Sequence, residues 1–121
     1  MGWSVEYTDE FGAWWDILAE SEQISIDAHV RKLESSGPHL RFPYSSGISG
    51  SRHPHMRELR VQSGGKPLRV FYAFDPRRSA ILLIGGDKTG NQRFYDRMIP
   101  VADALYDDHL AELEKEKDDG R

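Results

Sequence analysis

The residues best suited to chemistry are Glu58, Arg60 and Arg69, which fall in two neighbouring segments of alternating polar and apolar residues. The segments are joined through Gly64 and Gly65, and this arrangement predicts a β-hairpin with a two-residue turn. In the register that such a turn imposes, Arg60 lies directly opposite Arg69, and Glu58 shares their face. Like charges that face each other across a strand pair repel. An anionic ligand is the simplest reason for placing them there.

The chemistry that this face predicts is cleavage of RNA. The guanidinium fork of arginine matches the geometry of a phosphate, so Arg60 and Arg69 are expected to clamp one, with Lys88 approaching from the rim. Glu58 is the candidate general base for a ribose 2′-hydroxyl, while the cations stabilise the charge that grows on the phosphate. This reaction needs neither a metal nor a cofactor. The alternative is an exposed sheet face of solvated charges, since surface ion pairs are common and contribute little.

Further candidates for RNA contacts lie around this face and in a long loop. They are Arg57, His53, His55, Arg93 and Tyr95. The sequence His53-Pro54-His55, with His39 nearby, offers imidazoles to a metal, but no acidic or cysteine side chain clusters with them. A stable metal site requires more ligands, so we favour contacts with RNA or water.

The segment Gly85–Gly90 is similar to a phosphate-binding loop. That loop requires the pattern G-x-x-x-x-G-K-[ST], and Asp87 occupies the position of its second glycine. We therefore exclude nucleotide binding through this segment. We expect its glycines to let the chain turn sharply out of a strand.

The net charge of −4 conceals a strong segregation along the chain. Residues 38–97 contain eleven Lys and Arg against four Asp and Glu, whereas residues 1–37 contain two against eight and residues 98–121 three against eight. A basic middle between acidic ends predicts a local anion site on an acidic body. The alternative is that the acidic helices simply neutralise a basic sheet.

Length and composition predict one domain with a modest core. The sequence has no run of eighteen apolar residues and no basic-then-apolar N-terminal segment, so we expect neither a membrane span nor a signal peptide. Cysteine is absent. Its absence removes disulfides and thiolate chemistry and agrees with a reducing cytoplasm, where we expect the protein to act.

Hydrophobic periodicity predicts a strand over residues 3–8, a helix that follows Thr8 as its N-cap, and a second helix from about Glu22 to a stop at Gly37 and Pro38. Together the two helices are expected to form an antiparallel pair packed on the sheet. Residues 38–55 show no sustained period and predict a functional or mobile loop.

The segments after the hairpin complete the predicted fold. Residues 79–85 are rich in apolar side chains at successive positions and predict a strand that is covered on both faces. A helix is expected from residue 91, with Pro100 either interrupting it or opening a new one, and a charged, frayed tail from about residue 114. The order strand, helix, helix, three antiparallel strands and helix predicts a small α+β sandwich.

Several short motifs, taken in order, resemble the HigB-like branch of the RelE/ParE toxin superfamily. They are W-x-V-E-Y and E-F near the N-terminus, L-E-x-x-G-P-x-L before the long loop, S-R-x-x-x-M-R-E-L-R, L-R-V-F-Y-A-F and L-L-I-G-G-D-K-T. The resemblance covers residues 3–109, which is most of the chain, and it implies a RelE-like fold.

The resemblance also implies a function. It predicts the toxin of a type II toxin–antitoxin system that cleaves mRNA on the ribosome without metal or cofactor, and that has a cognate antitoxin, often a helix-turn-helix DNA-binding protein. The family's functional positions fall on Glu58, Arg60, Arg69, Tyr72 and Lys88. Two alternatives remain open, because fold alone does not settle the target. The first is a non-enzymatic poison of a protein such as DNA gyrase, and the second is an inactive binding module.

Overall fold

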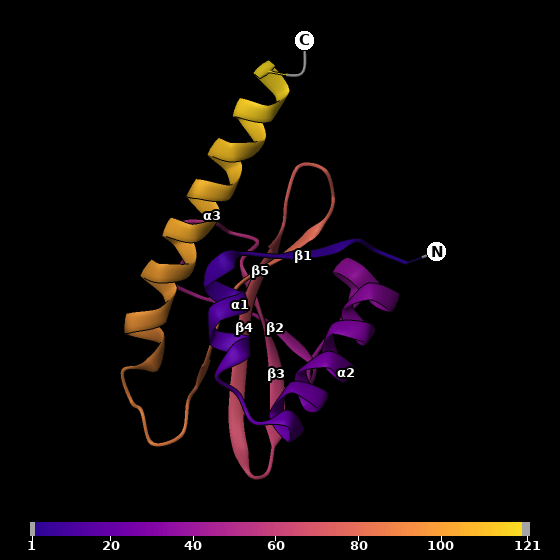
Figure 1. The fold of residues 1–121 in the computed structure, drawn as a ribbon. Coiled ribbons are helices and arrows are strands. Elements are labelled where there is room, and N and C mark those ends of the chain that lie inside the picture. The colour runs from indigo at the N-terminus through magenta and orange to yellow at the C-terminus, as the bar shows by residue number, and fades with distance from the viewer. Residues whose placement is uncertain (1, 120–121) are drawn as a thin grey trace.

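The computed structural model describes residues 2–119, which form a five-stranded sheet and three α-helices (Figure 1). The strands are β1 (Val5–Tyr7), β2 (Ser45–Gly47), β3 (Arg57–Ser63), β4 (Lys66–Phe74) and β5 (Ala80–Asp87). The helices are α1 (Asp9–Asp16), α2 (Glu20–Ser36) and α3 (Phe94–Asp119), and a 3₁₀ turn covers Gly37–His39. The strand order is β1-β5-β4-β3-β2, with β1 parallel to β5 and the other pairs antiparallel.

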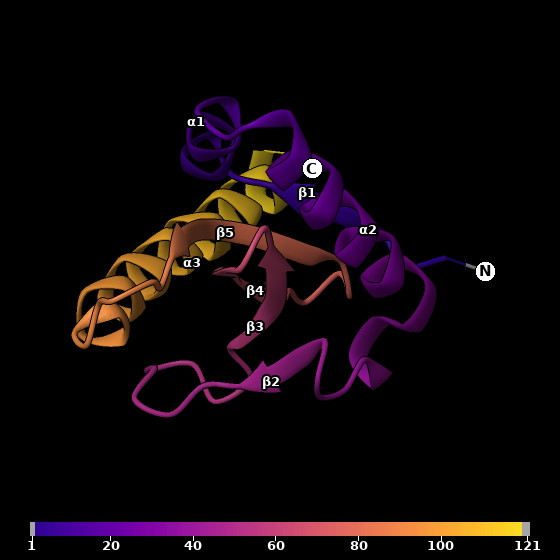
Figure 2. The same ribbon diagram turned by 90° about the horizontal axis from the view of Figure 1, so that it is seen from below.

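The sheet carries helices on both faces, with α1 and α2 on one side and α3 on the other (Figure 2). This arrangement follows from the apolar side chains of β5, because a strand points successive residues to opposite faces. Leu82 packs in the core beneath α1 and α2, whereas Ile81 and Leu83 pack in the core beneath α3. The predicted α+β order is therefore confirmed, including a strand that is covered on both sides.

The β3–β4 hairpin has the register that its glycine pair predicts. Gly64 and Gly65 have φ angles of +57° and +81°, as a type I′ turn requires at both central positions. Arg60 is consequently the cross-strand partner of Arg69. The apolar face of the hairpin packs against α1 and α2, and the charged face lies on the side of the sheet that carries α3.

The loop between α2 and β3 contains one strand that we did not predict. β2 is three residues long and forms an edge of the sheet by pairing antiparallel with β3, so that Ser46 lies opposite Glu58. Its side chains are small, and three residues are too few to display the alternation that identifies a strand in sequence. The expectation of an irregular segment over residues 38–55 is corrected accordingly.

The prediction for Pro100 is wrong, because α3 runs through it without a break. A proline inside a helix removes one backbone hydrogen bond, but the turns around it bury Ile99 and Ala102 against the sheet, and this packing offsets the local cost. The charged segment after residue 114, for which we expected fraying, continues the helix to Asp119. Although α3 has 26 residues, no helix within residues 2–119 is both long enough and apolar enough to cross a membrane.

Gly85 and Gly86 lie inside β5 and not in a turn after it, which corrects the role that we expected for them. A Cβ atom at Gly85 would overlap the Trp14 ring of α1, and one at Gly86 would lie 2.8 Å from the Phe94 ring of α3. The two glycines therefore allow helices to approach both faces of the same strand. In this way β5 brings the first turn of α3 close to the sheet.

Replacing Gly85 by alanine is expected to lower the free energy of unfolding by about 1–3 kcal/mol, the usual cost of forcing an extra carbon into a packed core. Urea unfolding followed by tryptophan fluorescence measures the change. Gly47→Ala is the matched control, because Gly47 also lies in a strand but a Cβ there would meet its nearest neighbour at 3.7 Å. Equal stability of the two variants would show that Gly85 has no packing role.

Candidate active site

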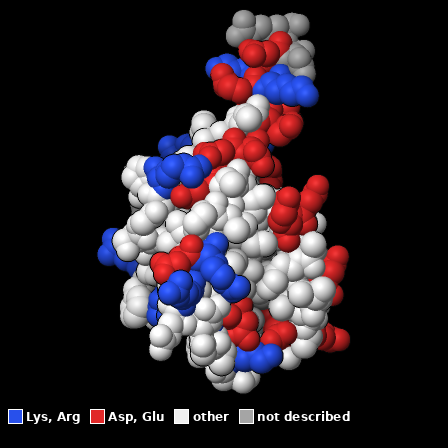
Figure 3. Space-filling model, turned by 90° about the vertical axis from the view of Figure 1, so that its left-hand side faces the viewer, with Lys and Arg blue, Asp and Glu red and all other residues white. Residues whose placement is uncertain are grey.

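The side of the molecule that carries α3 displays charges of both signs (Figure 3). In this view Lys and Arg side chains lie beside Asp and Glu side chains in both halves of the molecule, and both signs are present on the projecting end of α3. The acidic C-terminal helix meets the basic middle of the chain directly, since Arg52 forms an ion pair with Asp107 of α3. Part of the segregation seen in the sequence is thus neutralised at the surface.

Arg60 of β3 and Arg69 of β4 stand side by side, and Glu58 places its carboxylate between them. Oε2 of Glu58 lies 3.3 Å from Nη1 of Arg60, and Oε1 lies 3.7 Å from Nε of Arg69. The carboxylate therefore offsets the repulsion between the two guanidinium groups. Glu58 is thus an anion within the protein that accompanies the two arginines. The three side chains together still have a net positive charge, because two cations surround one carboxylate.

Two hydroxyl groups from other elements fix the Glu58 side chain. Tyr95, in the first turn of α3, donates to Oε1 at 2.7 Å, and Ser46 of β2 donates to Oε2 at 2.9 Å. Glu58 is only 4% exposed. Its orientation is therefore set by hydroxyl groups from two other elements, β2 and α3.

The two arginines differ in their access to solvent. Arg69 is 5% exposed, and its Nη1 donates to the carbonyl oxygen of Leu68 at 3.0 Å. Its Nε is buried without a hydrogen-bond acceptor among residues 2–119, since 3.7 Å to Glu58 is too long for a hydrogen bond. The side chain of Arg60 is 27% exposed. Arg69 is thus a buried partner of Glu58, whereas Arg60 is a cation that a ligand can reach.

Lys88, which follows the end of β5, and Tyr95, at the start of α3, lie next to Glu58, Arg60 and Arg69. Nζ of Lys88 lies 5.2 Å from the centroid of the Tyr95 ring, within the range of a cation–π contact. Burial raises the pKa of the Tyr95 hydroxyl, and its hydrogen bond to Glu58 acts in the same direction, while Arg69 opposes both. Tyr95 therefore keeps its proton at neutral pH and acts as a donor to the carboxylate.

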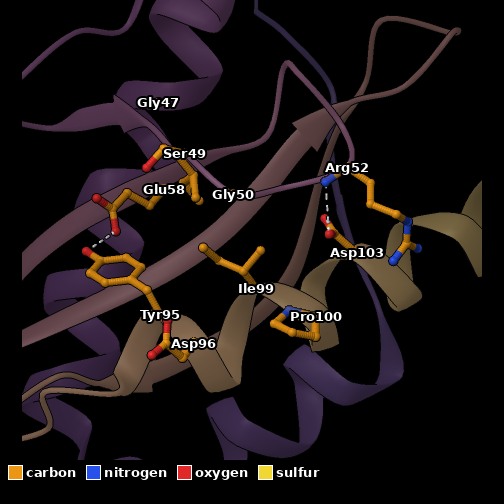
Figure 4. A pocket seen from close by; sticks show the side chains of 11 residues that line it. Gly47, Ser49, Gly50, Arg52, Glu58, Tyr95, Asp96, Ile99, Pro100 and Asp103 are labelled. Atoms are coloured by element: carbon orange, nitrogen blue, oxygen red, sulfur yellow. Dashed lines mark hydrogen bonds between the residues drawn. The ribbon is translucent and has the colours of Figure 1, made fainter.

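An open pocket of about 610 Å³ borders the group (Figure 4), within the usual size range of small-ligand sites. Glu58 and Tyr95 lie at one end and point toward each other, and Ile99 of α3 lies between them and the other end. Arg52 and Asp103 line that second end. The pocket wall thus combines β3, α3 and the loop after β2.

Tyr72 and Arg57 do not reach this pocket, because both lie toward the opposite face of the sheet. Tyr72 is fully buried beneath α1 and α2, and its hydroxyl lies 2.6 Å from Oγ of Ser45. Nε of Arg57 donates to the same Ser45 hydroxyl at 3.0 Å. This placement could have been predicted from the sequence, because residues two apart in a strand point to the same face. Tyr72 therefore shares the face of Val70 and not that of Arg69.

The predicted histidine contacts are also separate from Glu58. Nε2 of His53 lies 2.8 Å from a carboxylate oxygen of Asp107, on α3. His55 lines a different hollow, and Arg93 is exposed in the turn before α3. Tyr95 is therefore the one predicted RNA contact whose side chain bonds to Glu58. Among the residues that the structure describes, no three His, Asp or Glu side chains converge as metal ligands.

Sequence reasoning missed Ser46 and the attachment of the loop after β2. Oγ of Ser51 donates to Asp103 at 2.5 Å, and the N–H of Arg52 donates to the same carboxylate at 3.0 Å. The hydrogen bond from His53 is the main cause that lowers the pKa of Asp107. These partners are more than fifty residues apart, so no local pattern in the sequence indicates them.

The fold is that of the RelE toxins. A double mutant of the Escherichia coli toxin RelE in the free state has a TM-score of 0.60 at 10% identity, over 81% of this chain and 96% of that one. The intact E. coli RelBE toxin–antitoxin complex gives 0.55 at 12% identity, over 69% and 94%. The archaeal RelE–RelB complex from Pyrococcus horikoshii OT3 gives 0.55 at 15%, over 74% and 99%. At these identities the likeness concerns the fold alone.

Sequence comparison identifies the family. Residues 13–107 match the model of the family described as phage derived protein Gp49-like (DUF891). Two relatives from Mycobacterium tuberculosis, both classed as candidate toxins, are HigB2, at 37% identity over 97% of this chain, and HigB3, at 40% over 81%. The chain spans 59% of the length of HigB2 and 85% of that of HigB3. The chain therefore belongs to the Gp49-like family, is similar in sequence to HigB proteins, and has the fold of the RelE toxins.

Loss of the Arg69 side chain is expected to cost more stability than loss of Arg60. Arg69→Ala leaves the Glu58 carboxylate without its buried partner and is expected to lower the free energy of unfolding by about 3 kcal/mol. Arg60→Ala removes a partly exposed cation, and we expect a loss of about 1 kcal/mol or less.

Urea unfolding of the two variants measures this difference. Adding Glu58→Gln to Arg69→Ala removes the buried carboxylate charge that has lost one of its two cations and is expected to recover part of the loss. Equal destabilisation by the two alanine variants would contradict the assignment of Arg69 as the buried partner.

Proposed function

We propose that the protein is the toxin of a type II toxin–antitoxin system and that it cleaves mRNA on the ribosome. The observation that carries this proposal is the carboxylate of Glu58 held between Arg60 and Arg69 at the border of an open pocket. A carboxylate among cations suits a phosphodiester, because it accepts a proton where positive charge stabilises a phosphate. Sequence similarity to HigB proteins and the RelE fold support the same class of function.

Each side chain has a distinct role in the proposed reaction. Glu58 accepts the proton of a ribose 2′-hydroxyl, whose oxygen attacks the neighbouring phosphorus to form a 2′,3′-cyclic phosphate. The bond from phosphorus to the 5′ oxygen of the next nucleotide breaks, and that oxygen takes up a proton and leaves as a hydroxyl group. Arg60 and Lys88, which are partly exposed, contact the phosphate and stabilise the charge that develops on it. Arg69 acts through Glu58 as a positioning residue, and Tyr95 holds the same carboxylate by its hydroxyl group.

Expression of the chain alone in a bacterium is expected to arrest growth and to create new 5′ ends inside translated messages. Arg60→Ala is expected to reduce cleavage about 100-fold, because removal of one group that stabilises transition-state charge has an effect of this size. Growth curves and transcriptome-wide mapping of 5′ ends are the measurements. Arg31→Ala is the control, since the Arg31 side chain is 74% exposed on α2, which packs on the face of the sheet opposite α3.

Three outcomes decide between the functions considered for this fold. Cuts within reading frames that disappear in Arg60→Ala support the nuclease. Growth arrest with intact messages and a DNA-damage response would replace the nuclease with a poison of a protein such as gyrase. Normal growth with folded, abundant protein would leave an inactive binding module.

A cognate antitoxin is the proposed partner. The solved RelE structures from E. coli and P. horikoshii include complexes with RelB, and the resemblance to HigB-like proteins favours a helix-turn-helix DNA-binding protein. We expect this partner to be encoded beside the present chain.

Co-expression of the adjacent reading frame is expected to restore growth and to yield a complex that co-elutes in size-exclusion chromatography. An antitoxin from an unrelated system serves as the control and is expected to do neither. Persistent growth arrest in the presence of soluble product from the adjacent frame would exclude that product as the antitoxin.

A further inference from the structure

The turn that leads into β2 exposes a large aromatic ring beside the candidate active site. Phe42 is 70% exposed. The turn is closed by hydrogen bonds from the N–H groups of Tyr44 and Ser45 to the carbonyl oxygen of Arg41, at 3.0 and 3.1 Å. It is also tied to β3, because the N–H of Arg60 donates to the carbonyl oxygen of Tyr44 at 2.8 Å. The backbone therefore presents Phe42 from a fixed position.

Phe42 is connected to the catalytic group through Arg60. The guanidinium carbon of Arg60 lies 5.0 Å from the centroid of the Phe42 ring, within the range of a cation–π contact. The same guanidinium donates to Glu58 at 3.3 Å. Phe42 belongs to neither of the two core clusters, so core packing does not account for it. The ring lies one side chain away from the carboxylate that acts as base in the proposed reaction.

We propose that Phe42 is a stacking platform for a nucleobase of single-stranded RNA next to the phosphate that is cleaved. This inference rests on the proposed function, because it assigns a contact within the RNA substrate. Aromatic rings beside cations are the usual means by which proteins hold single strands. Arg60 contacts the phosphate, and Phe42 receives the base of a neighbouring nucleotide. Every base has a π face, so Phe42 contributes affinity and places the strand without reading its sequence.

Tyr44, on the same turn, is directed to a different part of the molecule. Its ring centroid lies 4.7 Å from Nζ of Lys32 and 6.0 Å from the centroid of the His29 ring, and both partners belong to α2. It therefore does not share the position of Phe42 beside Arg60. We assign the stacking role to Phe42 alone.

Two fluorescent probes separate stacking from phosphate binding. One is a hexaribonucleotide, and the other is a ribose–phosphate chain of the same length that carries no bases. In fluorescence anisotropy at low salt, wild-type protein is expected to bind the hexaribonucleotide about 5- to 150-fold more tightly than the base-free chain, the range that stacking of one base gives. Phe42→Ala is expected to lose this preference and to bind both probes with the affinity that wild-type protein has for the base-free chain. Phe42→Tyr keeps an aromatic ring and is expected to retain the preference.

Controls distinguish this role from a general effect on the fold or on charge. Tyr7→Ala is the matched surface variant, because Tyr7 is 67% exposed and lies in β1, at the opposite edge of the sheet; its binding is expected to equal that of wild-type protein. Arg60→Ala is expected to weaken binding of both probes. The urea midpoint of Phe42→Ala is expected to stay within error of the wild-type value.

The inference fails if folded Phe42→Ala keeps the base preference, or if wild-type protein binds both probes equally, and the cleavage proposal then stands unaffected. Binding of neither probe would also overturn the stacking role. In that case the mapping of cut messages decides separately whether the protein is a nuclease.

Discussion

Electrostatic balance in the middle of the β3–β4 pair is the constraint on which the candidate site depends. Strand pairing places Arg60 beside Arg69, and the Glu58 carboxylate offsets the repulsion between their positive charges. Since Glu58 and Arg69 are almost wholly buried, loss of Glu58 leaves Arg69 without an ion-pair partner in a medium of low dielectric constant, and loss of Arg69 leaves Glu58 with the partly exposed Arg60 as its cation. Tyr95 and Ser46 complete the arrangement, so α3 and β2 both influence the site through this one carboxylate.

The helix α3 contributes side chains both to the hydrophobic core and to the wall of the pocket. Ile99 and Ala102 pack on the sheet, while Tyr95 holds Glu58 and Asp103 anchors the loop after β2. The position of the helix depends in turn on Gly86, since any side chain there would push Phe94 away. A backbone feature of β5 thus sets how closely the hydroxyl of Tyr95 approaches the carboxylate.

The sequence was sufficient for features that follow from a local rule. The Gly64-Gly65 turn fixes the register that pairs Arg60 with Arg69, and strand alternation fixes their shared face with Glu58. The same alternation places Tyr72 on the face of the sheet opposite Glu58, Arg60 and Arg69. Ser46 was beyond prediction, because β2 is too short and too polar to show a period. The hydrogen bond from Tyr95 to Glu58 and the continuity of α3 through Pro100 depend on tertiary packing. A short stretch of sequence does not reveal such packing.

The hairpin also has a consequence for the order in which the molecule folds. Glu58 and Arg69 are eleven positions apart, so a tight turn brings their charges together at a small cost in loop-closure entropy. Hairpins form within microseconds, and pairings between distant segments form later. Tyr95 lies 37 positions from Glu58 and reaches it when α3 docks. We therefore expect Glu58 and Arg69 to meet early in folding and the complete pocket to form later, when α3 docks on the sheet.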